Sequence, residues 1–216
     1  MTRGLLQAIG ALGLVLGCAA CGSSEGPSPP RREDPEPEPE PPTEEASRFC
    51  PALFDRSPTS GNPRPQNRGR PRVGTSVLRE ALREEAGALR RERDGTIEEG
   101  TAGHASDSAW GHYGSGALGV RIDVTDLVHV CTLAPGTGRA LVENGRGLPP
   151  GGRRRPVVVE GHPALAVDVD GHAALSLVVA DRCWVLVHAN GLPQDQPVEA
   201  VTREIVDLAH LAARCR

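Results

Sequence analysis

The chain has 216 residues, a formal net charge of −4 and 24 basic side chains, all of them Arg. Only two Trp, one Tyr and two Phe occur, so a core must be built from Val, Leu and Ala. Negative charge and few aromatic rings argue against nucleic-acid binding, which needs cations for the phosphates and rings that stack on the bases. The absence of Lys excludes lysine-based catalysis.

The N-terminal segment 1–21 has the pattern of an export signal. Residues 5–17 form an apolar run that is too short to cross a bilayer, and Cys18 and Cys21 follow small residues. This arrangement resembles the lipobox of bacterial lipoproteins, in which a Cys receives acyl chains such as palmitate and becomes the mature N-terminus. We favour Cys18, because the aliphatic Val15 stands three residues before it. Cys21 is the alternative, and a signal peptide cleaved without lipidation is a third interpretation.

Residues 22–74 have the composition of a linker. Alternating Pro and Glu between residues 34 and 42 favours extended polyproline II over helix or sheet. Residues 22–48 would then reach roughly 80 Å as a tether. Five Arg lie between residues 56 and 72 and either contact an anionic envelope surface or belong to a solvated linker. Residues 49–54 contain both Phe and are expected to dock on the domain through Cys50.

Residues 75–216 are predicted to form the globular domain. Apolar residues recur at helical spacing from Leu78 to Leu89, which predicts an amphipathic helix over residues 76–93. Strands are predicted at residues 105–113 and 117–125, and residues 134–155 form a loop rich in Gly, Pro and Arg. Residues 126–133 fit either a strand or a short helix.

Residues 157–188 contain apolar runs that predict a three-stranded β-meander. Polar turns separate the strands at residues 170–172 and 180–182. Turns of three residues pair Val169 with Ala173 in the first hairpin and Val179 with Cys183 in the second. In this register one face is apolar across all three strands.

An apolar seam from Val198 to Cys215 predicts a C-terminal helix over the meander. The expected fold is therefore α+β: an antiparallel sheet of about five strands, with the C-terminal helix on one face. The helix over residues 76–93 would pack beside it or on the other face.

Motifs for known chemistry are weak. Residues 136–139 lack the spacing and the Lys of a phosphate loop, and residues 168–172 have Val179 where a calcium loop needs Glu. Ser176 lacks a nucleophile elbow. His172 and His188 can come close together in the meander, but zinc sites take three or four ligands. We expect no metal site, no cofactor and no catalytic residue.

The Cys beyond the signal region lie far apart along the chain, which favours disulfides over a redox or zinc motif. These residues are Cys50, Cys131, Cys183 and Cys215. The last strand and the returning helix bring Cys183 near Cys215, which leaves Cys50 for Cys131. The other two connectivities stay open.

The order of features resembles a group of uncharacterised bacterial lipoproteins. A lipobox and acidic tether precede the strand at residues 120–126, Gly161-His162-Pro163-Ala164 opens a hairpin, and residues 179–185 and 207–212 follow. The layout also resembles, more distantly, small extracytoplasmic α/β domains of the PsbP-like and sensor-domain kinds. These motifs are structural, so the resemblance implies no active-site residue.

Together these patterns predict a lipid-anchored, non-catalytic extracytoplasmic domain, in the periplasm or elsewhere in the cell envelope. It would bind an envelope protein or polymer through Trp184, His172 and His188, with residues 134–155 beside them. The alternative is a hydrolytic enzyme with a site around His172 and His188.

Overall fold

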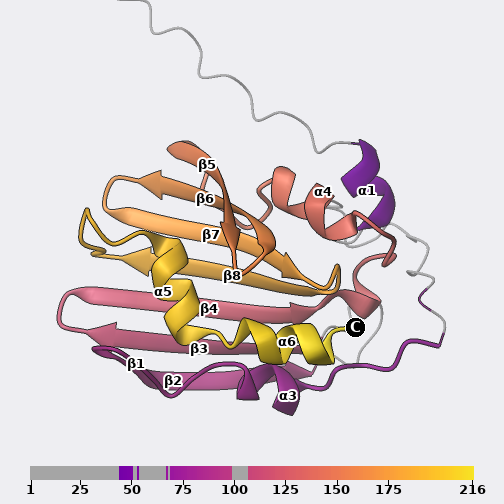
Figure 1. The fold of residues 1–216 in the computed structure, drawn as a ribbon, viewed down its shortest axis with the longest axis horizontal. Coiled ribbons are helices and arrows are strands. Elements are labelled where there is room, and N and C mark those ends of the chain that lie inside the picture. The colour runs from indigo at the N-terminus through magenta and orange to yellow at the C-terminus, as the bar shows by residue number, and fades with distance from the viewer. Residues whose placement is uncertain (1–43, 51–52, 54–66, 68, 99–106) are drawn as a thin grey trace, which may run out of the picture. The chain divides into compact units, whose positions relative to one another are not determined.

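The computed structural model of the protein describes residues 44–50, 53, 67, 69–98 and 107–216. The predicted signal peptide, with Cys18 and Cys21, lies outside these residues, as does most of the predicted linker. Eight strands form one antiparallel sheet in the order β1-β2-β3-β4-β8-β7-β6-β5 (Figure 1). The strands are β1 (Glu85–Ala86), β2 (Leu89–Glu98), β3 (Asp107–Ser115), β4 (Leu118–Asp126), β5 (Arg153–Val159), β6 (His162–Val169), β7 (His172–Val179) and β8 (Cys183–Asn190).

The expected sheet of about five strands was wrong, and so was the helix predicted over residues 76–93. Helix α3 (Thr75–Glu80) is short, and the chain then turns at Gly87, whose φ is 59°, into the β1–β2 hairpin. Ala86 and Leu89 continue the helical spacing of the preceding apolar residues, yet they are buried as strand residues. Apolar spacing alone therefore could not distinguish the helical period from the strand period in this segment.

The β-meander exists as β6, β7 and β8, but the predicted register of its first hairpin was wrong by one residue. Val169 pairs with His172, so the turn contains only Asp170 and Gly171. Both have positive φ, 39° and 80°, as the tight type I′ turn requires. Because side chains alternate, the slip moves Val167 and its neighbours to the opposite face of β6. The second hairpin has the predicted register, with Val179 opposite Cys183.

The C-terminal segment forms two helices where one was expected, α5 (Val198–Ile205) and α6 (Leu208–Arg214). Val206 between them is extended and bridges to Leu82. Asp207 then caps α6 by accepting a hydrogen bond from the backbone N–H of His210 at 2.8 Å. The extended residue between the two helices lets both α5 and α6 pack on the same face of the sheet.

Two apolar clusters lie on opposite faces of the sheet. The larger lies between one sheet face and α3, α5 and α6, and includes Leu177, Val185, Val201 and Leu208. The smaller lies on the other face under α4 (Thr137–Glu143), which formed inside the predicted loop, and includes Leu141 and Val178. Helix α4 contacts β6 and β7, which lie toward the β5 edge of the sheet.

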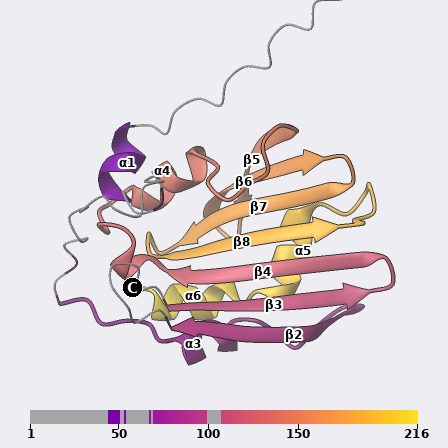
Figure 2. The ribbon, with the colours of Figure 1, turned by 180° about the vertical axis from the view of Figure 1, so that it is seen from behind.

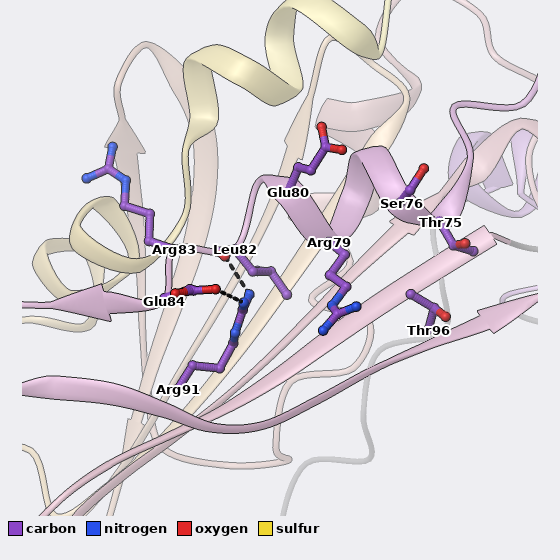
Figure 3. A pocket seen from close by; sticks show the side chains of 9 residues that line it. All are labelled: Thr75, Ser76, Arg79, Glu80, Leu82, Arg83, Glu84, Arg91 and Thr96. Atoms are coloured by element: carbon purple, nitrogen blue, oxygen red, sulfur yellow. Dashed lines mark hydrogen bonds and ion pairs between the residues drawn. The ribbon is translucent and has the colours of Figure 1, made fainter.

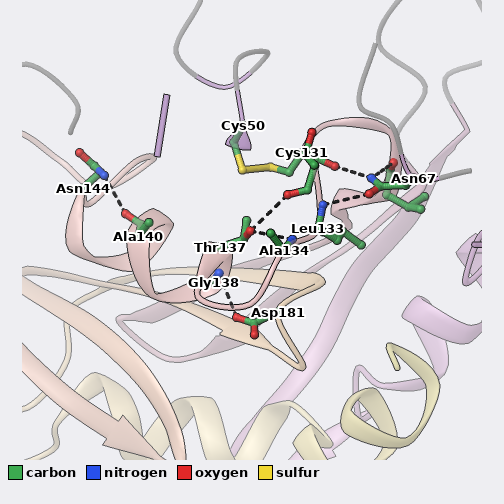
Figure 4. The surroundings of a disulfide bond; sticks show 12 residues. Cys50, Asn67, Cys131, Leu133, Ala134, Thr137, Gly138, Ala140, Asn144 and Asp181 are labelled. Atoms are coloured by element: carbon green, nitrogen blue, oxygen red, sulfur yellow. Dashed lines mark hydrogen bonds between the residues drawn. A yellow bond between two sulfur atoms is a disulfide. The ribbon is translucent and has the colours of Figure 1, made fainter. Parts of the chain in front are cut away.

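The disulfides join Cys183 to Cys215 and Cys50 to Cys131, the pairing favoured from the sequence. The first ties β8 to the end of α6. The second attaches α1 (Glu44–Phe49) to the segment after a 3₁₀ turn at Leu127–His129 (Figure 4). The side chain of Asn67 bonds the backbone of Val128, Cys131 and Leu133 in the same place. Cys50 and Asn67 therefore attach their parts of the predicted linker to the domain.

Candidate binding face

One sheet face is covered by α3, α5 and α6, whereas the described residues cover only part of the opposite face. Figure 2 shows this opposite face, with α4 and α1 at one end. Directly paired residues in an antiparallel sheet share a face, so the strand register identifies which side chains lie on it. We define the open face by the following eight residues on β3, β4, β8 and β7: Trp110, His112, Arg121, Asp123, His172, Leu186, His188 and Asn190.

His172 and His188 are in direct contact on the open face. Their rings are stacked with centroids 5.5 Å apart, and Nε2 of His172 lies 3.3 Å from Nδ1 of His188. On the far side of the first ring, Nδ1 of His172 lies 2.6 Å from Oδ1 of Asn190. The meander thus brings together the two His that the sequence placed at the same end of neighbouring strands.

The surroundings of His188 favour its neutral form. Burial lowers the pKa of His188, and the nearby His172 and Arg121 lower it further. Asp123 and the backbone of Gly147 raise the pKa but do not outweigh these effects. An imidazole held neutral keeps a lone pair available as an acceptor or ligand.

Arg121 and His112 extend the polar part of the open face across β4 and β3. Arg121 donates two hydrogen bonds to its neighbour Asp123, at 2.8 and 2.9 Å, which fixes the guanidinium. Beside it an open hollow of about 460 Å³ is bordered by His112, Arg121, His188 and Glu92. The hollow combines donors of both imidazole and guanidinium type with one carboxylate.

Trp110 supplies the aromatic part of the open face. It lies opposite Gly95 on β2, where a Cβ atom would come within 2.8 Å of the indole. The missing side chain lets the ring lie across the neighbouring strand, and the edge of His112 contacts it at 5.4 Å between centroids. Neither Trp110 nor His112 stood out in the sequence. Their spacing of two within a predicted strand was the only signal that they share a face.

Trp184, the third residue predicted to bind, lies at the covered end of the sheet. It packs against the smaller apolar cluster, and its indole N–H donates to the Ser176 hydroxyl at 2.9 Å. Gly147 lies close over it, because a Cβ there would be 3.2 Å from the indole. Residues from the predicted loop therefore cover Trp184. Ser176 is fully buried and engaged in this bond, a poor position for a nucleophile.

A second hollow, of about 640 Å³, lies between α3 and β2 (Figure 3). Three Arg border it, and each of them already has a polar partner, which for Arg83 is the Glu204 carbonyl at 3.4 Å. Arg79 bonds Asp94 at 2.6 Å, and Arg91 donates to the Leu82 carbonyl at 2.6 Å and lies near Glu84 and Asp94. These contacts stabilise the β1–β2 hairpin and offset the positive charge, so this hollow is a weaker candidate for anion binding than its Arg content indicates.

Comparison with known proteins gives no family: no family model, no curated protein and no solved structure matches the chain. The two disulfides indicate an oxidising, extracytoplasmic location. Among the described residues, no helix has the length and apolar character needed to cross a membrane. Within the same residues, no group of three or more His, Cys, Asp or Glu side chains is placed to hold a metal ion.

Proposed function

We propose that the protein is a lipid-anchored extracytoplasmic binding module that engages a partner protein of the cell envelope through the open face. The observation that carries this proposal is the asymmetry of the sheet. One face is sealed by three helices, whereas the other presents half-buried Trp110, His112 and His188 over several adjacent strands. Antiparallel sheets can leave one polar face in water. A face that also carries apolar side chains, and that the described residues leave partly uncovered, fits an interaction surface.

The composition of the open face favours a protein partner. Interface cores are enriched in Trp and Arg and contain few unpaired charges. Here Trp110 provides apolar area, and Arg121 is neutralised by Asp123. A carbohydrate polymer that stacks on Trp110 is the second class of partner to be distinguished by experiment.

The lipid anchor supports the same function from the sequence. Acyl chains on Cys18, or on Cys21, would hold the protein at a membrane, since several chains are needed for stable attachment. The Pro/Glu tether would then let the domain reach a partner near that surface at a raised effective concentration. Mass spectrometry of the mature N-terminus tests the anchor; an unmodified peptide that begins within residues 19–25 contradicts it.

Photo-crosslinking of the full chain tests the open face. A photo-reactive amino acid in place of His112 should capture a discrete envelope protein in the native host. The matched control carries the same group in place of Glu204, which is exposed on α5 on the covered side of the sheet. Equal capture from both positions, or none from position 112, argues against the proposal. A carbohydrate adduct at position 112 would show that the partner is a polymer and not a protein.

The hydrolase alternative is tested with the double substitution His172→Ala/His188→Ala. A folded variant that loses a turnover present in the wild-type protein would favour the enzyme. The remaining described Cys are disulfide-bonded and Ser176 is buried, which leaves the imidazole pair without an obvious nucleophile in the described residues.

A further inference from the structure

Two His and one Arg form a row across the open face. Arg121 on β4 is paired directly with His112 on β3 and with His188 on β8. Paired side chains in an antiparallel sheet lie about 5 Å apart, and all three border the same open hollow of about 460 Å³. Like charges directly opposite one another destabilise a sheet, so in the free protein the row is most stable while both imidazoles are neutral.

The next row along the same strands leaves space for a ligand. Gly114, Gly119 and Asn190 are paired across β3, β4 and β8, and a Cβ atom on Gly119 would meet nothing within 4 Å. The Glu92 side chain lies over Gly114, where an added Cβ would collide with its carboxylate. The hollow therefore already holds one carboxylate, and its volume is much larger than that group.

Two members of the row have nitrogens available for a ligand. The guanidinium of Arg121 bonds Asp123 through Nε and Nη2, and among the described residues nothing bonds its Nη1. In the same part of the chain the His112 ring makes no hydrogen bond, only the edge contact with Trp110. Both side chains can therefore donate to an acceptor placed over the hollow.

The charge of the hollow depends on its two imidazoles. Asp123 offsets Arg121, and Glu92 adds a negative charge, so with neutral imidazoles the hollow has no excess positive charge. Imidazoles are the side chains that ordinarily change charge between about pH 5 and 8. Each proton gained by His112 or His188 would add one positive charge beside Arg121, and an anion over the row would then offset the repulsion among these groups.

The groups around His188 act in both directions. Burial lowers its pKa most, and His172 on β7 and Arg121 on β4 lower it further. Asp123 on β4 and the backbone of Gly147 raise it. A carboxylate bound over the row would add a negative neighbour and would raise this pKa. Carboxylate binding and proton uptake are therefore coupled, and each strengthens the other.

His112 has charged neighbours of both signs. Its cross-strand partner on β2 is Arg93, and Glu92 on the same strand borders the hollow. On β4 it faces Arg121. A carboxylate that accepts a hydrogen bond from this ring would favour its protonated form, as at His188.

We propose that His112, Arg121 and His188 together bind a carboxylate in an acidic segment of the partner protein, and that both imidazoles are protonated in the complex. The open face would then hold its partner more tightly as the pH falls. An acidic protein segment fits better than a densely charged polymer, because the row has only three basic groups and two acids flank it. This inference rests on the proposed function, since it names the chemistry of the partner.

Fluorescence anisotropy of a rhodamine-labelled hexaglutamate peptide tests the site in the full-length protein, at low ionic strength where charges are least screened. The peptide should bind at least about fivefold more tightly at about pH 5.5 than at about pH 7.5. His112→Gln and His188→Gln should each remove most of this increase. Glu92→Gln should strengthen binding, because it removes the carboxylate already in the hollow. A hexaglutamine peptide should not bind.

His162→Gln is the matched control, because His162 is also half-buried but lies on β6, outside the row. It should keep the wild-type pH profile, which separates the row from a general change in protein charge. All variants keep the acidic residues between positions 34 and 42, so these contribute equally to each comparison. The wild-type profile needs no substitution, so it tests the site even where a variant fails to fold.

The inference is overturned if hexaglutamate binds equally at both pH values, or if folded His112→Gln and His188→Gln proteins keep the full increase. Binding of polygalacturonate but not of hexaglutamate would also overturn it, because the ligand would then be a carbohydrate. Capture of an envelope protein from position 112, together with any of these results, would leave the proposed function in place and refute only the carboxylate site.

Discussion

Arg182 and Asp126 form a two-point ion pair inside the protein. Nε and Nη2 of Arg182 each lie 2.8 Å from an Asp126 oxygen, and the side chains are 3% and 0% exposed. Asp126 also accepts from the backbone N–H groups of Val73 and Val128, and Arg182 donates to the Pro71 carbonyl. The pair thus connects the end of β4, the β7–β8 turn and the segment before α3.

Replacing Arg182 with Met should destabilise the protein strongly. The change leaves the Asp126 carboxylate buried without its cation, which typically costs about 3–5 kcal/mol. Urea denaturation followed by fluorescence measures the loss. Arg139→Met is the matched control, because Arg139 pairs with Glu143 on the exposed side of α4, and it should leave the midpoint nearly unchanged.

The double variant Arg182→Met/Asp126→Asn separates charge burial from lost hydrogen bonds. Its single amide oxygen can accept from only one of the N–H groups of Val73 and Val128. The variant buries no unpaired charge, however, so it should be more stable than Arg182→Met alone. If Arg182→Met proves no more harmful than Arg139→Met, the ion pair is not the structural junction described above.

The disulfides should contribute differently to local order. Their sequence separations of 32 and 81 residues correspond to roughly 4 and roughly 4.5 kcal/mol in the chain-entropy model. Cys50→Ala/Cys131→Ala should release α1 to limited proteolysis while the sheet persists. Cys183→Ala/Cys215→Ala should instead lower the unfolding midpoint of the whole sheet, because α6 packs on it. Early cleavage near α1 in the second variant would contradict this division.

Tyr113 gives a specific alkaline transition. It is 2% exposed and donates to the Arg83 carbonyl at 2.7 Å, and burial raises its pKa to about 12, above the ordinary range of a phenol. A raised pKa means that the folded state favours the protonated phenol. This contribution to stability is complete below about pH 10 and is lost as the pH rises toward 12.

The chain has a single Tyr, so an ultraviolet absorbance titration reports Tyr113 alone. Ionisation should occur near pH 12 and coincide with loss of the folded state. Tyr113→Phe lacks the titrating group and should lose less stability between pH 10 and 12 than the wild type. Ionisation near pH 10 in the folded protein would show that the ring is accessible to water.

The central strands were predictable from sequence, because β4, β7 and β8 alternate or run apolar between clear turns. The faces of β6 were not, since apolar residues occur at both parities there and either register buries some of them. The dipeptide Asp170-Gly171 decides the register, because it is suited to the two positive φ angles of a two-residue turn. Treating His172 as a turn residue concealed that signal.

Residues 85–98 were predicted wrongly for a different reason. Leu89 is buried, and Arg91 beside it is held by Leu82, Glu84 and Asp94, so polar contacts replace a regular apolar pattern in β2. The closeness of His172 and His188 could be predicted from the β-meander. The open face was not, because it depends on which side the helices cover, and that follows from long-range packing.

Gly95→Ala should displace Trp110 from its position across β2. The new Cβ would lie 2.7 Å from the indole, and such overpacking typically costs about 1–3 kcal/mol. In a Trp184→Phe background the fluorescence comes from Trp110 alone, since the chain has two Trp, and its emission should shift toward that of solvated indole. Gly119→Ala is the matched control: Gly119 lies in β4, and a Cβ there meets nothing within 4 Å. Identical spectra for the two variants would show that Gly95 does not position Trp110.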